Sequence, residues 1–159
     1  MFAKTTYNGT LADQYDLLSK QLDALCTGET DAIANYSNAS ALLNQFLTDI
    51  NWVGFYFMKE GELVLGPFQG LPACVRISVG RGVCGTTVAK KETMVVEDVH
   101  AFPGHIACDA ASKSEIVVPI IKNEEVIGVL DIDSPTEARF NAEDQAGLEK
   151  FVAVLQKHV

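Results

Sequence analysis

Two β-hairpin signatures, one on each side of the middle of the chain, limit the folds that this sequence can adopt. In the first, the aromatic run 52–58 and the apolar run 63–68 flank a polar turn. In the second, the apolar runs 116–122 and 126–133 flank another. Apolar runs rich in β-branched and aromatic residues, joined by a short polar turn, are typical of antiparallel strand pairs. The chain is therefore expected to build an antiparallel sheet.

Helical patterns precede the first hairpin and follow the second. Thr10 with Asp13 three residues later predicts a capped helix that Gly28 ends. We expect Thr30 to cap a second helix, and Asn141 to cap a final one. Helical patterns at the two ends of a strand-rich centre indicate helices that pack on the sheet.

The central part of the chain adds smaller elements, with strands expected at 74–79 and 94–97 and a short helix at 83–90. The fold class is therefore α+β, a largely antiparallel sheet with helices packed on it. At 159 residues, the chain is expected to form a single domain over residues 1–159.

Charge and hydropathy exclude several classes of function. The net charge of −9 argues against binding to nucleic acid or to an anionic membrane surface. No apolar run reaches the length of a membrane span, and the N-terminus lacks a secretory pattern. We therefore expect a cytoplasmic protein. In a reducing compartment, its four cysteines are more often reactive, metal-binding or inert than structural.

The glycine-rich segment 80–85 formally matches a dinucleotide-binding motif, with Glu97 downstream. The helix expected after it is too short for the crossover of a doubly wound sheet, so we reject that interpretation. What remains is a turn at a helix N-terminus, which favours anions. Because Cys84 lies there, its thiol pKa is expected to be lowered.

Reactive residue types gather around the second hairpin. Cys108 lies in a long polar loop, 98–114, which leads to Glu115 and the first strand of the hairpin. Asp131 and Asp133 end the second strand, and their spacing places both carboxylates on one face. Two like charges beside apolar strand ends should raise at least one carboxyl pKa.

The remaining cysteines leave several kinds of chemistry open. Redox chemistry needs a nucleophilic thiol, a resolving thiol and an acid, and Cys74 or Cys84 could resolve an oxidised Cys108. A zinc site made of these three cysteines and His105 is a weaker alternative, because their spacing matches no common zinc pattern. Inert cysteines are another alternative, and Cys26 is expected to be a packed, inert thiol.

Seven segments of the chain together resemble the free methionine-(R)-sulfoxide reductases, which are single GAF-domain enzymes. The matching segments are 52–56, 63–70, 73–77, 80–86, 96–100, 104–112 and 128–134. The resemblance implies a six-stranded antiparallel GAF sheet, a homodimer, and reduction of free methionine-(R)-sulfoxide with thioredoxin as electron donor. It implies neither a metal nor a bound cofactor.

The resemblance also implies roles for individual residues. It implies that Cys108 is the nucleophile, that Cys74 resolves the sulfenic acid, and that Cys84 is a third thiol in the pocket. It places Trp52 against the substrate's methyl group, although position alone would equally suit a core residue. The three acidic residues expected around the substrate's ammonium and sulfoxide are Glu115, Asp131 and Asp133.

The principal alternative is a GAF domain without catalytic activity, which would bind a small molecule or sense oxidation through its thiols. GAF domains also serve as such sensors, and a fold does not by itself define a function.

Overall fold

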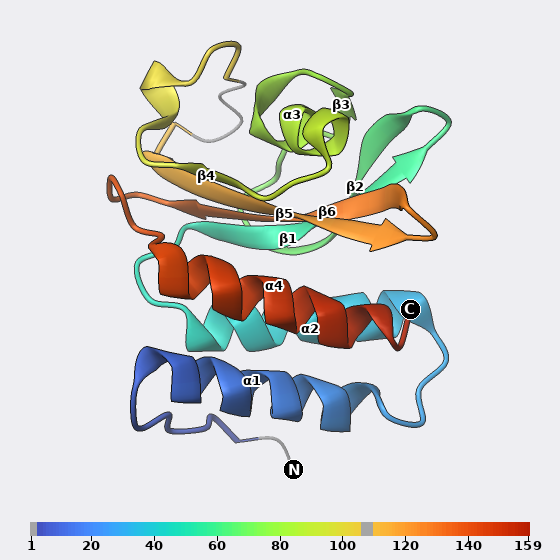
Figure 1. Cartoon of the computed structure of the whole chain (residues 1–159), viewed down its shortest axis with the longest axis vertical. Coiled ribbons are helices and arrows are strands. Elements are labelled where there is room, and N and C mark those ends of the chain that lie inside the picture. The colour runs from blue at the N-terminus through green and yellow to red at the C-terminus, as the bar shows by residue number, and fades with distance from the viewer. Residues whose placement is uncertain (1–2, 106–109) are drawn as a thin grey trace.

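The computed structural model describes residues 3–105 and 110–159. Its helices and strands follow the expected order along the chain (Figure 1). They are α1 (Leu11–Cys26), α2 (Ala32–Phe46), β1 (Trp52–Lys59), β2 (Glu62–Gly70), β3 (Arg76–Ser78), α3 (Gly82–Lys90), β4 (Met94–Val96), the 3₁₀ turn η1 (Val99–Ala101), β5 (Ser114–Lys122), β6 (Glu125–Ser134) and α4 (Ala142–Gln156).

The strands of the described residues form one six-stranded antiparallel sheet in the order β3-β2-β1-β6-β5-β4. Both predicted hairpins are confirmed, as β1–β2 and β5–β6. Asn123 and Glu124 both have positive φ, 51° and 68°, as a tight two-residue hairpin turn requires. The expected α+β class, with helices on an antiparallel sheet, is therefore correct.

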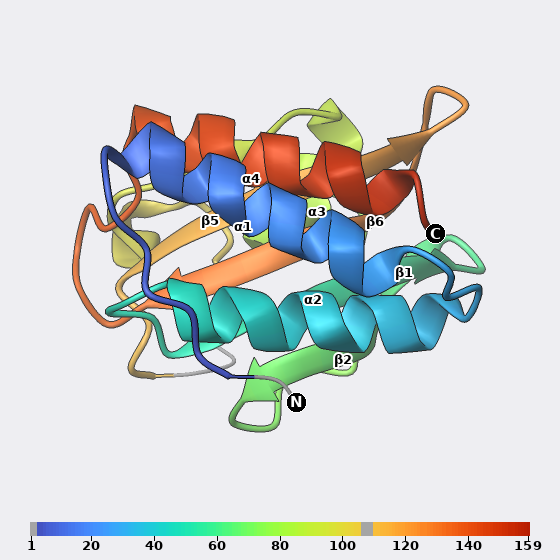
Figure 2. The same cartoon turned by 90° about the horizontal axis from the view of Figure 1, so that it is seen from below.

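The two faces of the sheet are covered differently. Helices α2 and α4 lie on one face, and α1 packs against them as a further layer (Figures 1 and 2). On the opposite face lie α3 and η1 (Figure 1). The sheet is thus sealed by long helices on one side and by one short helix with loops on the other.

The face under α2 and α4 holds the larger apolar core. Every second residue along the central strands points into this core, because side chains alternate between the two faces of a sheet. Phe55, Leu130 and Ile132 are among them, and all three are fully buried. Leu18 and Leu22 of α1 are also fully buried in this core. Cys26 is buried here as a free thiol, in agreement with its expected packing role.

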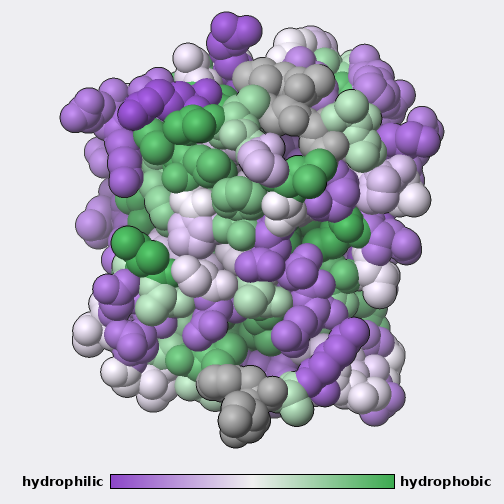
Figure 3. All heavy atoms as spheres, turned by 180° about the vertical axis from the view of Figure 1, so that it is seen from behind, coloured by the Kyte–Doolittle hydropathy of each residue, from purple (hydrophilic) through white to green (hydrophobic). Residues whose placement is uncertain are grey.

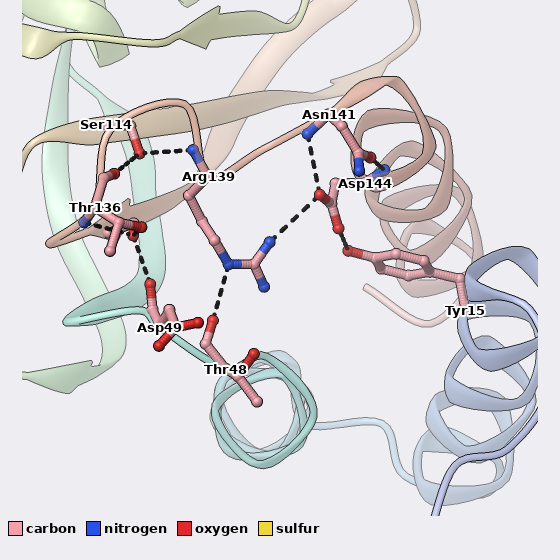
Figure 4. A network of polar contacts seen from close by, with 9 residues as sticks. Tyr15, Thr48, Asp49, Ser114, Thr136, Arg139, Asn141 and Asp144 are labelled. Atoms are coloured by element: carbon pink, nitrogen blue, oxygen red, sulfur yellow. Dashed lines mark hydrogen bonds and ion pairs between the residues drawn. The ribbon is translucent and has the colours of Figure 1, made fainter.

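A buried polar network joins this core to the chain segment before α4 (Figure 4). The Tyr15 hydroxyl donates to Asp144 at 2.7 Å, and the Arg139 guanidinium contacts the same carboxylate at 3.4 Å. Asp144 and Asn141 form a capping box at the start of α4, which confirms the predicted cap. Arg139 also donates through Nε to the Thr48 carbonyl oxygen, so the network links α1, the end of α2 and α4.

Three local predictions are corrected. Asp31, not Thr30, caps α2: its side chain accepts from the Ala34 N–H, and an aspartate is an equally good cap one residue later. The third strand is only Arg76–Ser78, shorter than the predicted 74–79. Strand β5 begins at Ser114, two residues before the predicted apolar run 116–122, so Glu115 lies within the sheet.

The outer surface mixes polar and apolar side chains. Seen from behind, apolar patches lie between polar ones in the upper half of the molecule, the half that contains the sheet and α3 (Figure 3). Exposed large apolar residues near β3 include Leu71, Val75 and Val79. No helix in the described ranges is long and apolar enough to cross a membrane.

Candidate active site

A pocket opens on the α3 face of the sheet, at the ends of β1, β5 and β6. Its walls come from three sources: the sheet, the start of α3 and the loops beside them. The lining residues are Trp52, Tyr56, Leu71, Pro72, Ala73, Ile77, Arg81, Gly82, Val83, Cys84, His105, Ser112, Glu115, Asp131 and Asp133.

Strand register brings the three predicted acidic residues together. Asp133 pairs with Trp52 of β1 on one side and with Glu115 of β5 on the other, and Asp131 lies two residues away on the same face. Cross-strand neighbours have Cβ atoms only about 5 Å apart. Glu115 hydrogen-bonds to both aspartates. The acidic centre is therefore built by pairing of β6 with its two neighbours.

Helix α3 brings a thiol to the same place. Its N-terminus packs closely on the segment before it, since a Cβ on Gly85 would lie 2.4 Å from the Ser78 carbonyl oxygen. Cys84, one residue earlier, is 4% exposed. Its Sγ and one carboxylate oxygen each of Glu115 and Asp131 all lie within 4.8 Å of one another. Gly85 thus permits the approach that sets Cys84 beside the acids.

Burial raises the carboxyl pKa values in this cluster. The pKa of Glu115 lies well above its usual range, first because burial removes water and then because Asp131 and Asp133 are negative neighbours. The pKa of Asp131 is also raised by burial, although hydrogen bonds from Glu115 and Cys84 oppose the shift. The predicted upward shift of at least one carboxyl pKa is confirmed, and Glu115 is the group suited to hold a proton.

The expected lowering of the Cys84 pKa is wrong. Its pKa is raised well above the usual thiol value, chiefly by burial and then by the charges of Asp131, Glu115 and Asp133. Cys84 does lie in the first turn of α3, where the helix favours an anion. The helix N-terminus lowers the thiol pKa by less than lost hydration and three neighbouring carboxyl groups together raise it.

Aromatic residues of β1 form the wall beside the acids. The Trp52 ring stacks on Phe68 at 5.2 Å and lies 5.9 Å from Tyr56. The Trp52 indole N–H donates to the Leu71 carbonyl oxygen at 3.1 Å, and the Tyr56 hydroxyl donates to the Cys74 carbonyl oxygen at 2.9 Å. Trp52 is therefore both a core residue and a pocket wall, and the two rings fix the segment that carries Cys74.

The three cysteines among the described residues are not all in the same state. Cys26 and Cys84 are free thiols, whereas Cys74 is disulfide-bonded. Cys108, the predicted nucleophile, lies outside the described residues. Among described residues, the cluster with metal-ligand spacing is Cys84 with Glu115 and Asp131, a different set from the zinc site considered above.

Several lining residues were not recognised in the sequence. In the sequence, Tyr56 has the pattern of an ordinary aromatic strand residue. It lies four residues after Trp52, however, so the alternation of the strand places both side chains on the same face. The sequence indicates His105 only as a possible zinc ligand, yet it lines the pocket, and burial lowers its pKa. No signal marked Arg81 or Ser112, which reach the pocket only through the tertiary fold.

Comparison with known proteins agrees with this geometry. Residues 21–158 match the GAF domain family. The free methionine-R-sulfoxide reductase of Escherichia coli is 57% identical over 143 residues, which span 90% of this chain and 87% of that protein. This chain belongs to the GAF-domain family of free methionine-R-sulfoxide reductases.

Solved structures from this family have the same fold. The fRMsr of Staphylococcus aureus, in complex with substrate, is 56% identical, with a TM-score of 0.88 over 97% of this chain and 99% of that one. The free methionine-R-sulfoxide reductase of Neisseria meningitidis, in complex with its substrate, is 43% identical, with a TM-score of 0.94 over 99% of this chain and 95% of that one.

Proposed function

We propose that this protein reduces free L-methionine-(R)-S-oxide to L-methionine. The observation that carries the proposal is the cluster of buried Glu115 and Asp131 with half-buried Asp133 beside Trp52, in a chain 57% identical to a reductase of that name. A pocket with three carboxyl groups needs a cationic ligand, since unpaired buried charge is destabilising. The α-ammonium of a free amino acid supplies that cation.

The other parts of the substrate match other walls of the pocket. The S-methyl group packs on Trp52, which is nearly fully buried and apolar. The α-carboxylate binds near the start of α3, where Gly82 and Val83 line the pocket and no side chain caps the helix. We assign Asp131 to the ammonium group, whereas Glu115 or Asp133 lies at the sulfoxide.

The reaction begins when the Cys108 thiolate attacks the sulfoxide sulfur. The S–O bond breaks as a carboxylic acid, Glu115 or Asp133, protonates the leaving oxygen. The hydroxyl group passes to the Cys108 sulfur as the transient bond between the two sulfur atoms breaks. Methionine departs with its sulfur reduced by two electrons, and Cys108 becomes a sulfenic acid. The raised pKa of Glu115 supports its role as donor, because it keeps the acid protonated near neutral pH.

A second thiol then closes the cycle. The Cys74 thiol condenses with the sulfenic acid, releasing water and forming a disulfide, which thioredoxin reduces by exchange. The disulfide-bonded state of Cys74 supports its assignment as the resolving thiol, and the free state of Cys84 fits a third thiol in the pocket. The cycle requires neither a metal nor a bound cofactor.

We further propose that residues 1–159 act as one GAF domain within a cytoplasmic homodimer. The match of residues 21–158 to the GAF domain family supports the assignment of a single domain.

A substrate comparison tests the proposed activity. Thioredoxin-coupled oxidation of NADPH is measured with free methionine-(R)-sulfoxide, its (S)-epimer, the N-acetylated (R)-sulfoxide and an internal peptide sulfoxide. Only the free (R)-sulfoxide should be reduced rapidly. The acetylated compound lacks the ammonium and should react on the order of a thousandfold more slowly. Comparable rates on the peptide would overturn the proposal.

Single substitutions separate the roles within the cycle. Asp131→Asn should mainly raise KM, and Asp133→Asn should mainly lower kcat if Asp133 contacts the sulfoxide. Cys74→Ser should release one equivalent of methionine per protein but recycle poorly with thioredoxin. If Cys74→Ser recycles normally and mass spectrometry finds a disulfide at Cys84, then Cys84 and not Cys74 is the resolving thiol.

A further inference from the structure

Three side chains at the base of the pocket offer atoms that could bind a metal ion, a capacity that the proposed reaction does not use. Cys84 offers a sulfur atom, and Glu115 and Asp131 offer carboxylate oxygens, all within 4.8 Å of one another. They come from three different elements, α3, β5 and β6. All three side chains are buried, with exposures of 4%, 6% and 6%. A cation placed among them would contact one atom of each.

One carboxylate oxygen of Asp131 lacks a hydrogen-bond donor. Within the described ranges, the buried Oδ1 of Asp131 has no partner, although its carboxylate neighbours Cys84 and Glu115. Buried carboxylate oxygens are normally satisfied, so an unpartnered one on a residue that lines the pocket indicates a missing ligand. An ammonium group could supply it during turnover, and a metal ion could supply it at other times.

We propose that Cys84, Glu115 and Asp131 bind a zinc ion that occupies the pocket in place of substrate. Zinc accepts sulfur, nitrogen and oxygen ligands in tetrahedral geometry, so three protein ligands leave one position for water. Magnesium and calcium prefer an all-oxygen set, and the Cys84 sulfur disfavours both. The expected effect on turnover is competitive inhibition, and that part alone rests on the proposed function.

Binding replaces protons with the metal. A Zn–S bond forms as the Cys84 thiol proton passes to the buffer, and a proton shared by the carboxyl groups leaves in the same way. No oxidation or reduction occurs, so removal of the ion with a chelator should restore the original pocket. Zinc would then act as a reversible blocker of the site.

Direct binding tests the proposal without any assay of turnover. The wild-type protein, with Cys74 disulfide-bonded, is titrated calorimetrically with zinc sulfate and spectroscopically with cobalt(II), whose sulfur-to-metal absorption reports a thiolate ligand. One ion should bind per chain, with the sulfur-to-metal band present. Magnesium sulfate should give no saturable binding.

Two ligand variants and one control variant test the assignment of the ligands. Cys84→Ser should lose the sulfur-to-metal band and weaken zinc binding by about a hundredfold or more. Asp131→Asn retains the thiol and should also weaken binding, by at least about tenfold. Cys26→Ser, the matched control in the opposite core, should bind as the wild type does. Absence of saturable zinc binding, or a band unchanged in Cys84→Ser, would overturn the proposal whatever the activity assay shows.

Discussion

The two faces of the sheet show how one set of strands can serve two opposite demands. Along β6, Leu130 and Ile132 point into the core under α2 and α4, whereas Asp131 and Asp133 point into the pocket. The alternation of one strand thus supplies both apolar packing and the acidic centre. Apolar packing on the helix-covered face stabilises the fold. On the α3 face, the burial of carboxyl groups away from water lowers the stability of the folded state.

Substitutions on the two faces should therefore have opposite consequences. On the α3 face, a change should reduce activity with little loss of stability. On the helix-covered face, it should reduce stability with little change in the activity of the folded protein. The predictions below test this division, from the largest expected effect to the smallest.

Loss of the nucleophile should have the largest effect on activity. Cys108→Ser is expected to lower turnover by at least about a thousandfold, because a hydroxyl group is a far weaker nucleophile than a thiolate. Its melting temperature should match that of the wild type. Cys26→Ser, in the other core, should keep its activity. Retention of a few per cent of activity in Cys108→Ser would place the nucleophile elsewhere.

Removal of the buried acid should separate catalysis from stability. Glu115→Gln is expected to lower kcat by about 10²- to 10³-fold while the protein stays folded. Glu97→Gln is the matched control, because Glu97 is exposed on the neighbouring segment. Steady-state kinetics of the two variants would show the difference, and equal effects would contradict a special role for Glu115.

The same acid predicts a dependence of stability on pH. Its raised pKa means that the folded state holds a proton that the unfolded state has lost. Its stabilising contribution is therefore complete below the ordinary glutamate pKa and disappears as the pH rises through the folded pKa. Urea unfolding should show wild-type stability declining above about pH 4.5 relative to Glu115→Gln. Parallel curves would contradict this linkage.

A cavity in the helix-covered core should have the reverse effect. Leu22→Ala removes a fully buried side chain and should lower the free energy of unfolding by about 2–5 kcal/mol. Since Leu22 lies in the core on the opposite side of the sheet from the pocket, kcat/KM of the folded protein should change less than about twofold. A large fall in kcat/KM would show that the two faces are coupled.

A smaller effect is expected in the buried polar network. Tyr15→Phe removes the hydroxyl donor to Asp144, which keeps its contacts with Arg139 and the Asn141 N–H. The loss should be about 1–2 kcal/mol of stability. Thermal unfolding would measure it, and an unchanged melting temperature would show that the hydrogen bond adds no net stability.

Sequence reasoning succeeded where local patterns decide the structure. Alternation in residues 126–133 placed Asp131 and Asp133 on one face, and the turn at Asn123 and Glu124 defined the hairpin. It failed where distant segments meet. The helix N-terminus suggested a lowered pKa for Cys84, but three carboxyl groups from other elements raise it. Arg81 and Ser112 gave no local signal, because only the tertiary fold brings them to the pocket.

The hairpin turn at Asn123 and Glu124 lies at the far end of β5 and β6 from the acids, yet it determines which residues face each other there. Glu115 meets Asp133 only because the turn and the irregularity between Ile120 and Ile121 set that register. A one-residue insertion at this exposed turn that shifted the pairing would separate Glu115 from Asp133. The length of the turn is therefore constrained by the pairing of residues at the other end of the strands, and the positive φ at both positions restricts its residue types as well.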